Sequence, residues 1–271
     1  MTDKTALGDR MKRHEAAYRT VMPRRTYTIC RVDGRSFHSY LRGAAKPFDT
    51  QFMADMDAVA EALCTEITGA VFGFTQSDEI SILVTDFATE QTEPWFGGAT
   101  AKWLSITAAL ATAVLNDRRP GRRALFDSRV FTIADPVEVA NYFIWRQRDA
   151  VRNSISMAAQ AHFSHKRLHG VSSSGMQELL WSELGINWND YEPGCKQGRV
   201  TVRRTGDRPV EYVDRRSGET VRTTAVRSWW ETFAPQKAFT TEPGSWLART
   251  IPALPTLQPE PADSEVTCGA A

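Results

Sequence analysis

The sequence has no long apolar stretch, no closely spaced cysteine pair, no excess charge and no internal repeat. Its 271 residues carry 33 basic and 32 acidic side chains, for a net charge of +1. This balance points to no particular partner, so a nucleic-acid surface would have to be a local patch. No apolar run approaches the length that crosses a bilayer, and we therefore expect no membrane contact.

The sequence has few cysteines and no evident secretion signal. The wide spacing of the cysteines excludes the paired motifs of structural zinc sites. The first 19 residues are polar and lack the apolar core of a secretion signal. We therefore expect reduced thiols and a cytoplasmic protein. The four cysteines are Cys30, Cys64, Cys195 and Cys268.

Hydrophobic periodicity predicts alternating helices and strands in a chain long enough for one large domain or two small ones. This order favours an α/β fold of the α+β kind, with a mostly antiparallel sheet and helices on one side. Strands are predicted near residues 26–32, 71–74, 80–85, 130–133, 199–204, 210–213 and 222–226. Helices are predicted near residues 7–19, 52–67, 95–116, 136–145, 149–169 and 176–184.

Two acidic turns adjoin predicted strands. Asp33 and Gly34 end the first strand, and a helical turn with outward backbone N–H groups can follow them and bind phosphate. Asp78 and Glu79 lie at the tip of an apolar hairpin. If the two turns meet, Asp33, Asp78 and the Gly34 carbonyl supply the oxygen ligands that Mg²⁺ prefers. Two such ions could clamp a phosphoryl transfer, although surface or capping acids remain an alternative.

Basic residues concentrate in two places. Arg118, Arg119, Arg122 and Arg123 form a loop that suits an RNA backbone or is simply solvated. The segment from Arg199 to Arg227 is an arginine-rich ribbon followed by two tryptophans, which suits RNA binding or protects a sheet edge.

Two further patterns are interpreted as structural. Asp55 and Asp57 resemble a D-x-D motif but point to different faces of a helix, so we expect surface acids. His162, His165 and His169 would share one helix face, where a zinc site is an open alternative without an evident fourth ligand.

Five motifs, in this order, resemble those of the tRNA-His guanylyltransferase family. Each motif alone is weak, but the ordered set is specific and extends over about residues 7–205. They are Arg31 to His38, Ala45 to Asp49, Gln76 to Ser81, Trp145 to Asp149 and Glu178 to Asn189.

The resemblance implies a palm-like polymerase fold, two Mg²⁺ ions, ATP and GTP as substrates, and nucleotide addition to tRNA 5′ ends in the 3′–5′ direction. The tRNA 5′-monophosphate is first activated, and the 3′-hydroxyl of an incoming nucleotide then attacks it. A homotetramer is also implied. By motif, Asp33, Gly34 and Asp78 hold the metals, with Asp33 and Asp78 catalytic and Glu79 supporting them. Expected nucleotide-binding residues are Arg35, Ser36, Phe37, His38, Lys46, Ser77 and Asn153, and expected RNA contacts add Lys102, Lys196 and Arg199 to the basic loop.

Departures from the family pattern narrow the expected reaction. Members acting on tRNA-His carry a His-Ile-Asn-Asn stretch, where this chain has Val151 to Ser154 and retains only Asn153. It is therefore more similar to the bacterial and archaeal branch, which implies template-dependent repair of 5′-truncated tRNA. Gly97 and Gly98 replace basic family residues, and Lys196 has altered spacing.

Three alternatives stay open: guanylyl addition to tRNA-His, a nucleotidyl cyclase that needs no RNA, and a non-catalytic RNA-binding protein. We expect a palm-like domain over residues 1–205, an arginine-rich extension over 206–250 and a disordered, proline-rich tail over 251–271. The sequence does not indicate which tRNA is used.

Overall fold

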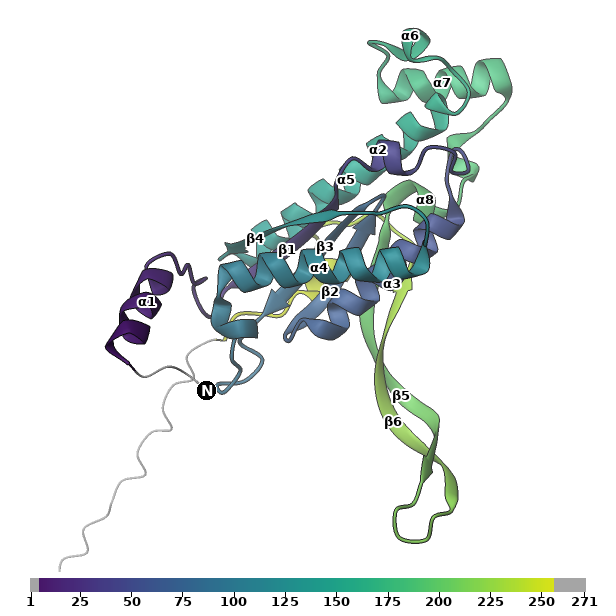
Figure 1. The fold of residues 1–271 in the computed structure, drawn as a ribbon. Coiled ribbons are helices and arrows are strands. Elements are labelled where there is room, and N and C mark those ends of the chain that lie inside the picture. The colour runs from purple at the N-terminus through teal and green to yellow at the C-terminus, as the bar shows by residue number, and fades with distance from the viewer. Residues whose placement is uncertain (1–4, 256–271) are drawn as a thin grey trace, which may run out of the picture.

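A six-stranded sheet forms the centre of the computed structural model, which describes residues 5–255 (Figure 1). The strand order is β4-β1-β3-β2-β5-β6, and every neighbouring pair is antiparallel. The predicted antiparallel sheet with helices is therefore confirmed. The strands are β1 (Tyr27–Gly34), β2 (Ala70–Gln76), β3 (Glu79–Thr85), β4 (Phe126–Ile133), β5 (Arg199–Val213) and β6 (Thr220–Phe233).

Helices cover both faces of the sheet rather than one, which corrects the expected one-sided arrangement. The α-helices are α1 (Ala6–Ala16), α2 (Phe37–Tyr40), α3 (Thr50–Glu66), α4 (Thr100–Arg118), α5 (Pro136–Gln160), α6 (His165–Leu168), α7 (Ser173–Leu184), α8 (Pro193–Gln197) and α9 (Trp246–Thr250). Two 3₁₀ turns are η1 (Trp95–Gly98) and η2 (Trp188–Asp190). None of the helices within residues 5–255 is both long and apolar enough to cross a membrane.

Alternation along the strands explains the two-sided core. Ile80, Ile82 and Val84 of β3 pack in one cluster with α3 and α4, whereas Leu83 packs in a second cluster with Phe143 of α5. Successive side chains of a strand point to opposite faces. The central strands carry apolar side chains at both odd and even positions, so the sheet can bury both of its faces. All seven residues of β3 are buried.

Local chemistry sets the helix ends that position the site. Asp49 caps α3, because its carboxylate accepts a hydrogen bond from the backbone N–H of Phe52 at 2.8 Å. Asp135 caps α5 in the same way, with Pro136 in the first turn. The helix predicted to begin at Trp95 is interrupted, because Phe96 and Gly97 have positive φ angles, and α4 starts only at Thr100.

One long helix, α5, replaces the two that were predicted on either side of Trp145. No proline or glycine interrupts it, and Arg146 and Asp149 form an ion pair one helical turn apart. Because α5 ends at Gln160, His162, His165 and His169 do not share a helix face. The described residues contain no group of three His, Cys, Asp or Glu side chains arranged to hold a metal ion.

The last two strands form a long ribbon that leaves the body of the molecule (Figure 1). Only the segment from Arg199 to Val202 pairs with β2, and beyond it β5 pairs with β6 alone. The expected domain boundary at residue 205 falls inside β5. Of the expected tail, residues 256–271 lie outside the described part of the chain.

Candidate active site

Two acids meet at one edge of the sheet. Asp33 occupies the end of β1, directly opposite Glu79 of β3, and Asp78 lies in the two-residue turn between β2 and β3. The backbone N–H of Gly34 donates a hydrogen bond to the Asp78 carbonyl at 3.1 Å, which ties the two turns together. The sequence-based expectation that these turns would meet is therefore confirmed.

Gly34 permits this close approach because it has no side chain. A Cβ atom at this position would lie 2.8 Å from Oδ2 of Asp78 and 2.4 Å from the ring of Phe37. Both separations are shorter than normal contacts between heavy atoms. Any larger residue would push the Asp78 carboxylate or Phe37 away from the end of β1.

Burial disfavours the ionised forms of both acids. Burial raises the pKa of Asp78 to about 6, and the charges of Asp33 and Glu79 act in the same direction, against hydrogen bonds from its own backbone and Ser77. The pKa of Asp33 is also raised, first by burial and then by Asp127, which faces it from β4. Arg129 approaches Asp33 only to 3.9 Å and is largely exposed.

Glu79, by contrast, has cationic partners. Its Oε2 accepts from Nη1 of Arg146 at 2.9 Å and lies 3.9 Å from Nη1 of Arg31. Burial still raises its pKa, whereas Arg146 and Arg31 oppose that rise. Arg146 also binds Asp149 at 2.6 Å, so it links the hairpin tip to α5. Glu79 is thus held by a close arginine, whereas Arg129 approaches Asp33 only to 3.9 Å.

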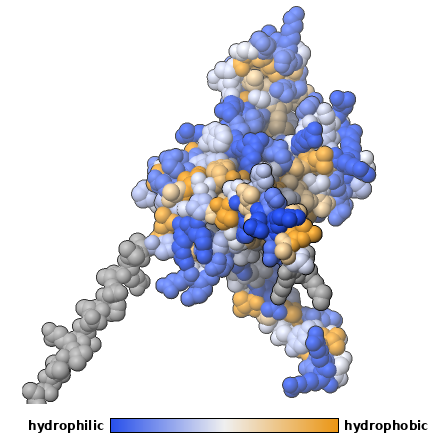
Figure 2. All heavy atoms as spheres, turned by 60° about the vertical axis from the view of Figure 1, so that its left-hand side comes forward, coloured by the Kyte–Doolittle hydropathy of each residue, from blue (hydrophilic) through white to orange (hydrophobic). Residues whose placement is uncertain are grey.

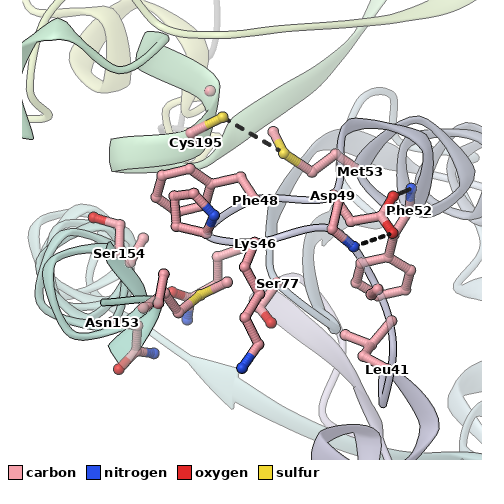
Figure 3. A pocket seen from close by; sticks show the side chains of 18 of the residues that line it. Leu41, Lys46, Phe48, Asp49, Phe52, Met53, Ser77, Asn153, Ser154 and Cys195 are labelled. Carbon is pink, nitrogen blue, oxygen red and sulfur yellow. Dashed lines mark hydrogen bonds between the residues drawn. The ribbon is translucent and has the colours of Figure 1, made fainter. Parts of the chain in front are cut away.

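A groove lined by Asp33, Asp78 and Glu79, which we call the acidic groove, leads to a cavity of about 280 Å³. Ser77 and Asn153 line both spaces, together with Gln76, Met157 and Gln160. In Figure 3, Lys46 lies between Asn153 and Ser154 on one side and Leu41 and Phe52 on the other. The cavity suits one small ligand, since its volume is near the lower end of the roughly 300–1,000 Å³ that is typical of ligand sites.

The structure brings several expected nucleotide-binding residues together at this cavity. His38, Lys46, Ser77 and Asn153 line it. Arg35 and Ser36 are exposed in the turn after Gly34, where Ser36 adopts a left-handed backbone conformation. Phe37 is 3% exposed and packs on other aromatic rings, so its side chain belongs to the core and only its backbone faces the turn.

Several expected RNA contacts have other partners in the structure. Arg199 is 7% exposed and binds Asp57 at 2.6 Å, which conflicts with a surface contact to RNA. Arg118 and Arg119 bind Asp55 at 2.9 and 3.1 Å. The expectation that Asp55 is a surface acid is therefore wrong: it is 2% exposed, because two arginines compensate its charge. Asp57 is likewise ion-paired with a buried arginine.

The remaining expected contacts are dispersed. Lys102 is exposed on α4, and Arg123 is exposed in the loop after it. The ammonium of Lys196 contacts the Asn189 carbonyl and lies 5.4 Å from the Trp188 ring centre. Arg122 donates to two backbone carbonyls near α2. None of these four residues lines the cavity or the acidic groove in the described part of the chain.

The sequence-based interpretation missed the apolar wall of the cavity and the function of Arg146. The wall includes Phe48, Met53, Met157 and Cys195, with the Cys195 thiol 3.7 Å from the Met53 sulfur. Their positions depend on contacts among α3, α5 and α8, and no local motif encodes such contacts. Arg146 lies within a recognised motif, but only the fold shows that Glu79 is its partner.

The comparisons with known proteins agree with this geometry. The profile of the family described as tRNAHis guanylyltransferase matches residues 8–134. A tRNA(His) guanylyltransferase of Debaryomyces hansenii is 27% identical over 195 residues, which cover 66% of this chain and 74% of that protein.

Solved bacterial structures are also similar. A bacterial tRNA(His) guanylyltransferase-like protein in complex with ATP is 44% identical, covers 73% of this chain and 88% of its own, and superposes with a TM-score of 0.70. Another, in complex with GTP, is 37% identical, with coverages of 86% and 94% and a TM-score of 0.69. The predicted palm-like polymerase fold is thereby confirmed. The chain belongs to the tRNAHis guanylyltransferase family of nucleotidyltransferases, on its bacterial-like branch.

Proposed function

We propose that this protein adds nucleotides to the 5′ end of tRNA in the 3′–5′ direction, guided by a template strand. The observation that carries the proposal is the meeting of Asp33, Gly34 and Asp78 at a groove continuous with a small-ligand cavity. The acids provide a place for metal ions and phosphates, and the adjoining cavity provides a place for a nucleoside.

The acids fit Mg²⁺ ions. Two carboxylates and a backbone carbonyl are hard oxygen donors, and Mg²⁺ usually takes one or two carboxylates together with waters and substrate phosphates. Burial raises the pKa of Asp78 to about 6, and a cation beside this carboxylate would favour its ionised form. Asp33, Asp78 and the Gly34 carbonyl would hold the ions, which would stabilise the charge on the reacting phosphates.

The cavity would take the nucleoside part of ATP or GTP. Relatives have been solved with each of these nucleotides. The apolar wall around Phe48 and Met53 suits a base, and Lys46, Ser77 and Asn153 offer donors to the ribose and phosphates. The exposed backbone after Gly34, with Arg35, Ser36 and His38, would bind the triphosphate. Glu79 would act indirectly, by fixing the hairpin tip through Arg146.

In the proposed reaction, the tRNA 5′-monophosphate first attacks the α-phosphate of ATP or GTP, which joins it to the nucleoside monophosphate and releases pyrophosphate. The 3′-hydroxyl of the incoming nucleotide then attacks this activated phosphate and displaces the activating group. The half-buried Asp33 and Asp78, together with the arginine-bound Glu79, form an edge that would keep the reacting phosphates in register. Both steps would use the same edge of the sheet.

Template-dependent repair is favoured over addition of a single guanylate to tRNA-His. The helix that faces the groove carries Val151, Arg152 and Asn153, where relatives specific for tRNA-His have a histidine. Only Asn153 of this stretch lines the groove. We further propose that the protein forms a homotetramer, which light scattering of the purified protein would test. We also propose a cytoplasmic location.

Labelled nucleotides and three RNA conditions test the proposal: 5′-truncated tRNA, full-length tRNA-His and no RNA. We expect template-matched addition to the truncated tRNA, with Mg²⁺ required. Addition of guanylate to tRNA-His alone would favour the family's name-giving reaction. Nucleotide turnover without RNA would indicate a cyclase, and RNA binding without nucleotide binding would indicate a non-catalytic protein; each of these outcomes would contradict the proposal.

A further inference from the structure

A second pocket adjoins the nucleotide cavity along the loop of residues 41–49. It is formed by the segment after α2 and by the loop after α4, and we call it the arginine pocket. Its main lining residues are Arg42, Ala44, Ala45, Asp49, Arg119 and Arg122. It shares part of the 41–49 loop with the cavity but has no lining residue in common with the acidic groove.

The charges around the arginine pocket do not cancel. Arg118 and Arg119 share one carboxylate, that of Asp55. Arg122 binds only backbone carbonyls, and the side chain of Arg42 has no hydrogen bond or ion pair within residues 5–255.

The one acid of the lining does not restore the balance. Both oxygens of Asp49 accept backbone N–H groups, from Phe52 at 2.8 Å and from Ala45 at 3.3 Å. The pocket and its immediate neighbours thus carry four guanidinium groups, those of Arg42, Arg118, Arg119 and Arg122, against the two carboxylates of Asp49 and Asp55, which leaves a net positive charge. An anionic ligand is the expected complement of such a site.

Two of the guanidinium groups are held in place before any ligand arrives. Nη1 of Arg122 donates to the carbonyls of Tyr40 and Arg42 at 2.7 and 2.8 Å, which joins the two loops. Arg119 is fixed by Asp55 and by the Phe52 ring, whose centre lies 5.6 Å from its guanidinium carbon. Preorganised arginines lose little entropy on binding, and their planar donor groups match a phosphate.

We propose that the arginine pocket binds a phosphate group that is not the one undergoing transfer. Because the pocket and the acidic groove share no lining residue, we expect that a single nucleotide with its phosphates at the acids does not place them in the pocket. The geometry favours a backbone phosphate of the bound RNA. This inference rests on the proposed function, and a second nucleotide is the other source that an experiment must distinguish.

The best variants remove a positive charge that no carboxylate balances. Arg42→Gln and Arg122→Gln alter exposed side chains with no carboxylate partner. Arg119→Gln is unsuitable, because it would leave buried Asp55 with one partner. Arg249→Gln is the matched control, since Arg249 is an exposed arginine on α9, which packs in the core cluster on the opposite face of the sheet. Thermal unfolding of each variant checks that the fold is retained.

Binding of a 5′-truncated tRNA is measured by fluorescence anisotropy over a series of salt concentrations. For the Arg42→Gln/Arg122→Gln double variant, we expect roughly tenfold weaker binding and a slope of log K against log salt reduced by about 1, the signature of one lost phosphate contact. Arg249→Gln should change the affinity less than about twofold. An equal loss in Arg249→Gln and the double variant would overturn the proposal, since it would show a general charge effect.

ATP titrations identify the source of the phosphate. Unchanged ATP affinity in the double variant, together with weaker RNA binding, assigns the site to the RNA backbone. Weaker ATP binding with unchanged RNA binding assigns it to a nucleotide, and no change in either overturns the site. The outcome is separable from the proposed reaction, because binding is measured without turnover: wild-type protein that binds tRNA but adds nothing would contradict the reaction and leave the pocket intact.

Discussion

The molecule contains two hairpins of opposite character. The β2–β3 hairpin lies in the middle of the sheet, is mostly buried, and places Asp78 at its tip. The β5–β6 ribbon is mostly exposed, and in Figure 2 hydrophilic side chains gather at its tip, the lower end of the view. Both hairpins carry charged residues, but only the first places them where water cannot solvate them fully.

Charged side chains behave differently in the two hairpins. In the buried hairpin, charges shift pKa values and bind fixed partners, as Glu79 does with Arg146. In the ribbon, ion pairs such as Arg204 with Glu231 at 3.0 Å are solvated on both sides. Exposed pairs contribute little to stability, whereas breaking a buried pair leaves an uncompensated charge. Four sets of variants test this contrast.

The largest expected effect is on stability. Arg146→Met removes the close cationic partner of buried Glu79 and should lower the free energy of unfolding by roughly 3–5 kcal/mol. Arg204→Met, which breaks an arginine–glutamate pair in the ribbon, should cost less than about 1 kcal/mol. Urea denaturation measures both. Adding Glu79→Gln to Arg146→Met should recover part of the lost stability. Equal losses of stability in Arg146→Met and Arg204→Met would contradict the distinction between the two hairpins.

The next effect depends on pH. Because burial raises the pKa of Asp78 to about 6, the folded metal-free protein holds this proton more tightly than the unfolded chain does. The associated stability is present below about pH 4 and lost as pH rises through about 6. Asp78→Asn should therefore stabilise the metal-free protein by roughly 2–3 kcal/mol near pH 7.5 relative to its effect near pH 4. A stability difference that does not vary with pH would contradict this assignment.

A smaller effect compares the two hairpin tips. Ser77 lines both the cavity and the acidic groove, whereas Ser217 accepts a hydrogen bond from the Glu219 N–H in the ribbon turn. Ser77→Ala should weaken ATP or GTP binding by roughly tenfold, about 1.4 kcal/mol. Ser217→Ala should leave it unchanged. Titration calorimetry distinguishes the two, and equal affinities for both variants would remove Ser77 from the nucleotide site.

The smallest effect is a coupling energy within the ribbon. Arg222 and Glu211 form an exposed cross-strand pair at 2.7 Å. A double-mutant cycle with Arg222→Gln and Glu211→Gln should give about 0.5 kcal/mol or less. A coupling of several kcal/mol would mean that the ribbon is not solvated as the structure indicates.

The acidic pair and the hairpin could be predicted from sequence because their signals are local. Asp33-Gly34 ends an apolar strand, and Asp78 separates two apolar runs. The strand ends and the turn residues therefore predict the positions of both acids at the edge of the sheet. The family motifs added residues of the cavity such as Lys46 and Asn153, which the structure places around one space. Their roles stay predictions until they are measured.

What could not be predicted depends on tertiary partners. Arg118 and Arg119 looked like a free basic loop, yet they bind Asp55, 63 and 64 residues away in sequence. The position of Asp55 within its own helix does not indicate that a second helix covers it, so the sequence predicts an exposed side chain. The break expected in α5 fails for a related reason: packing and side-chain ion pairs extend the helix past Trp145.

The most direct test of the central claim compares three acids at one sheet edge. Asp33 and Asp78 are the proposed metal ligands, and Asp127 is an exposed acid directly opposite Asp33 on β4. Asp33→Asn, Asp78→Asn and Asp127→Asn are assayed for template-matched nucleotide addition to 5′-truncated tRNA at saturating Mg²⁺. We expect the first two to lose at least about 1,000-fold in rate, as when charge stabilisation of a transition state is removed, while Asp127→Asn stays within about threefold of wild type. Folded Asp33→Asn or Asp78→Asn protein with wild-type activity would contradict the account.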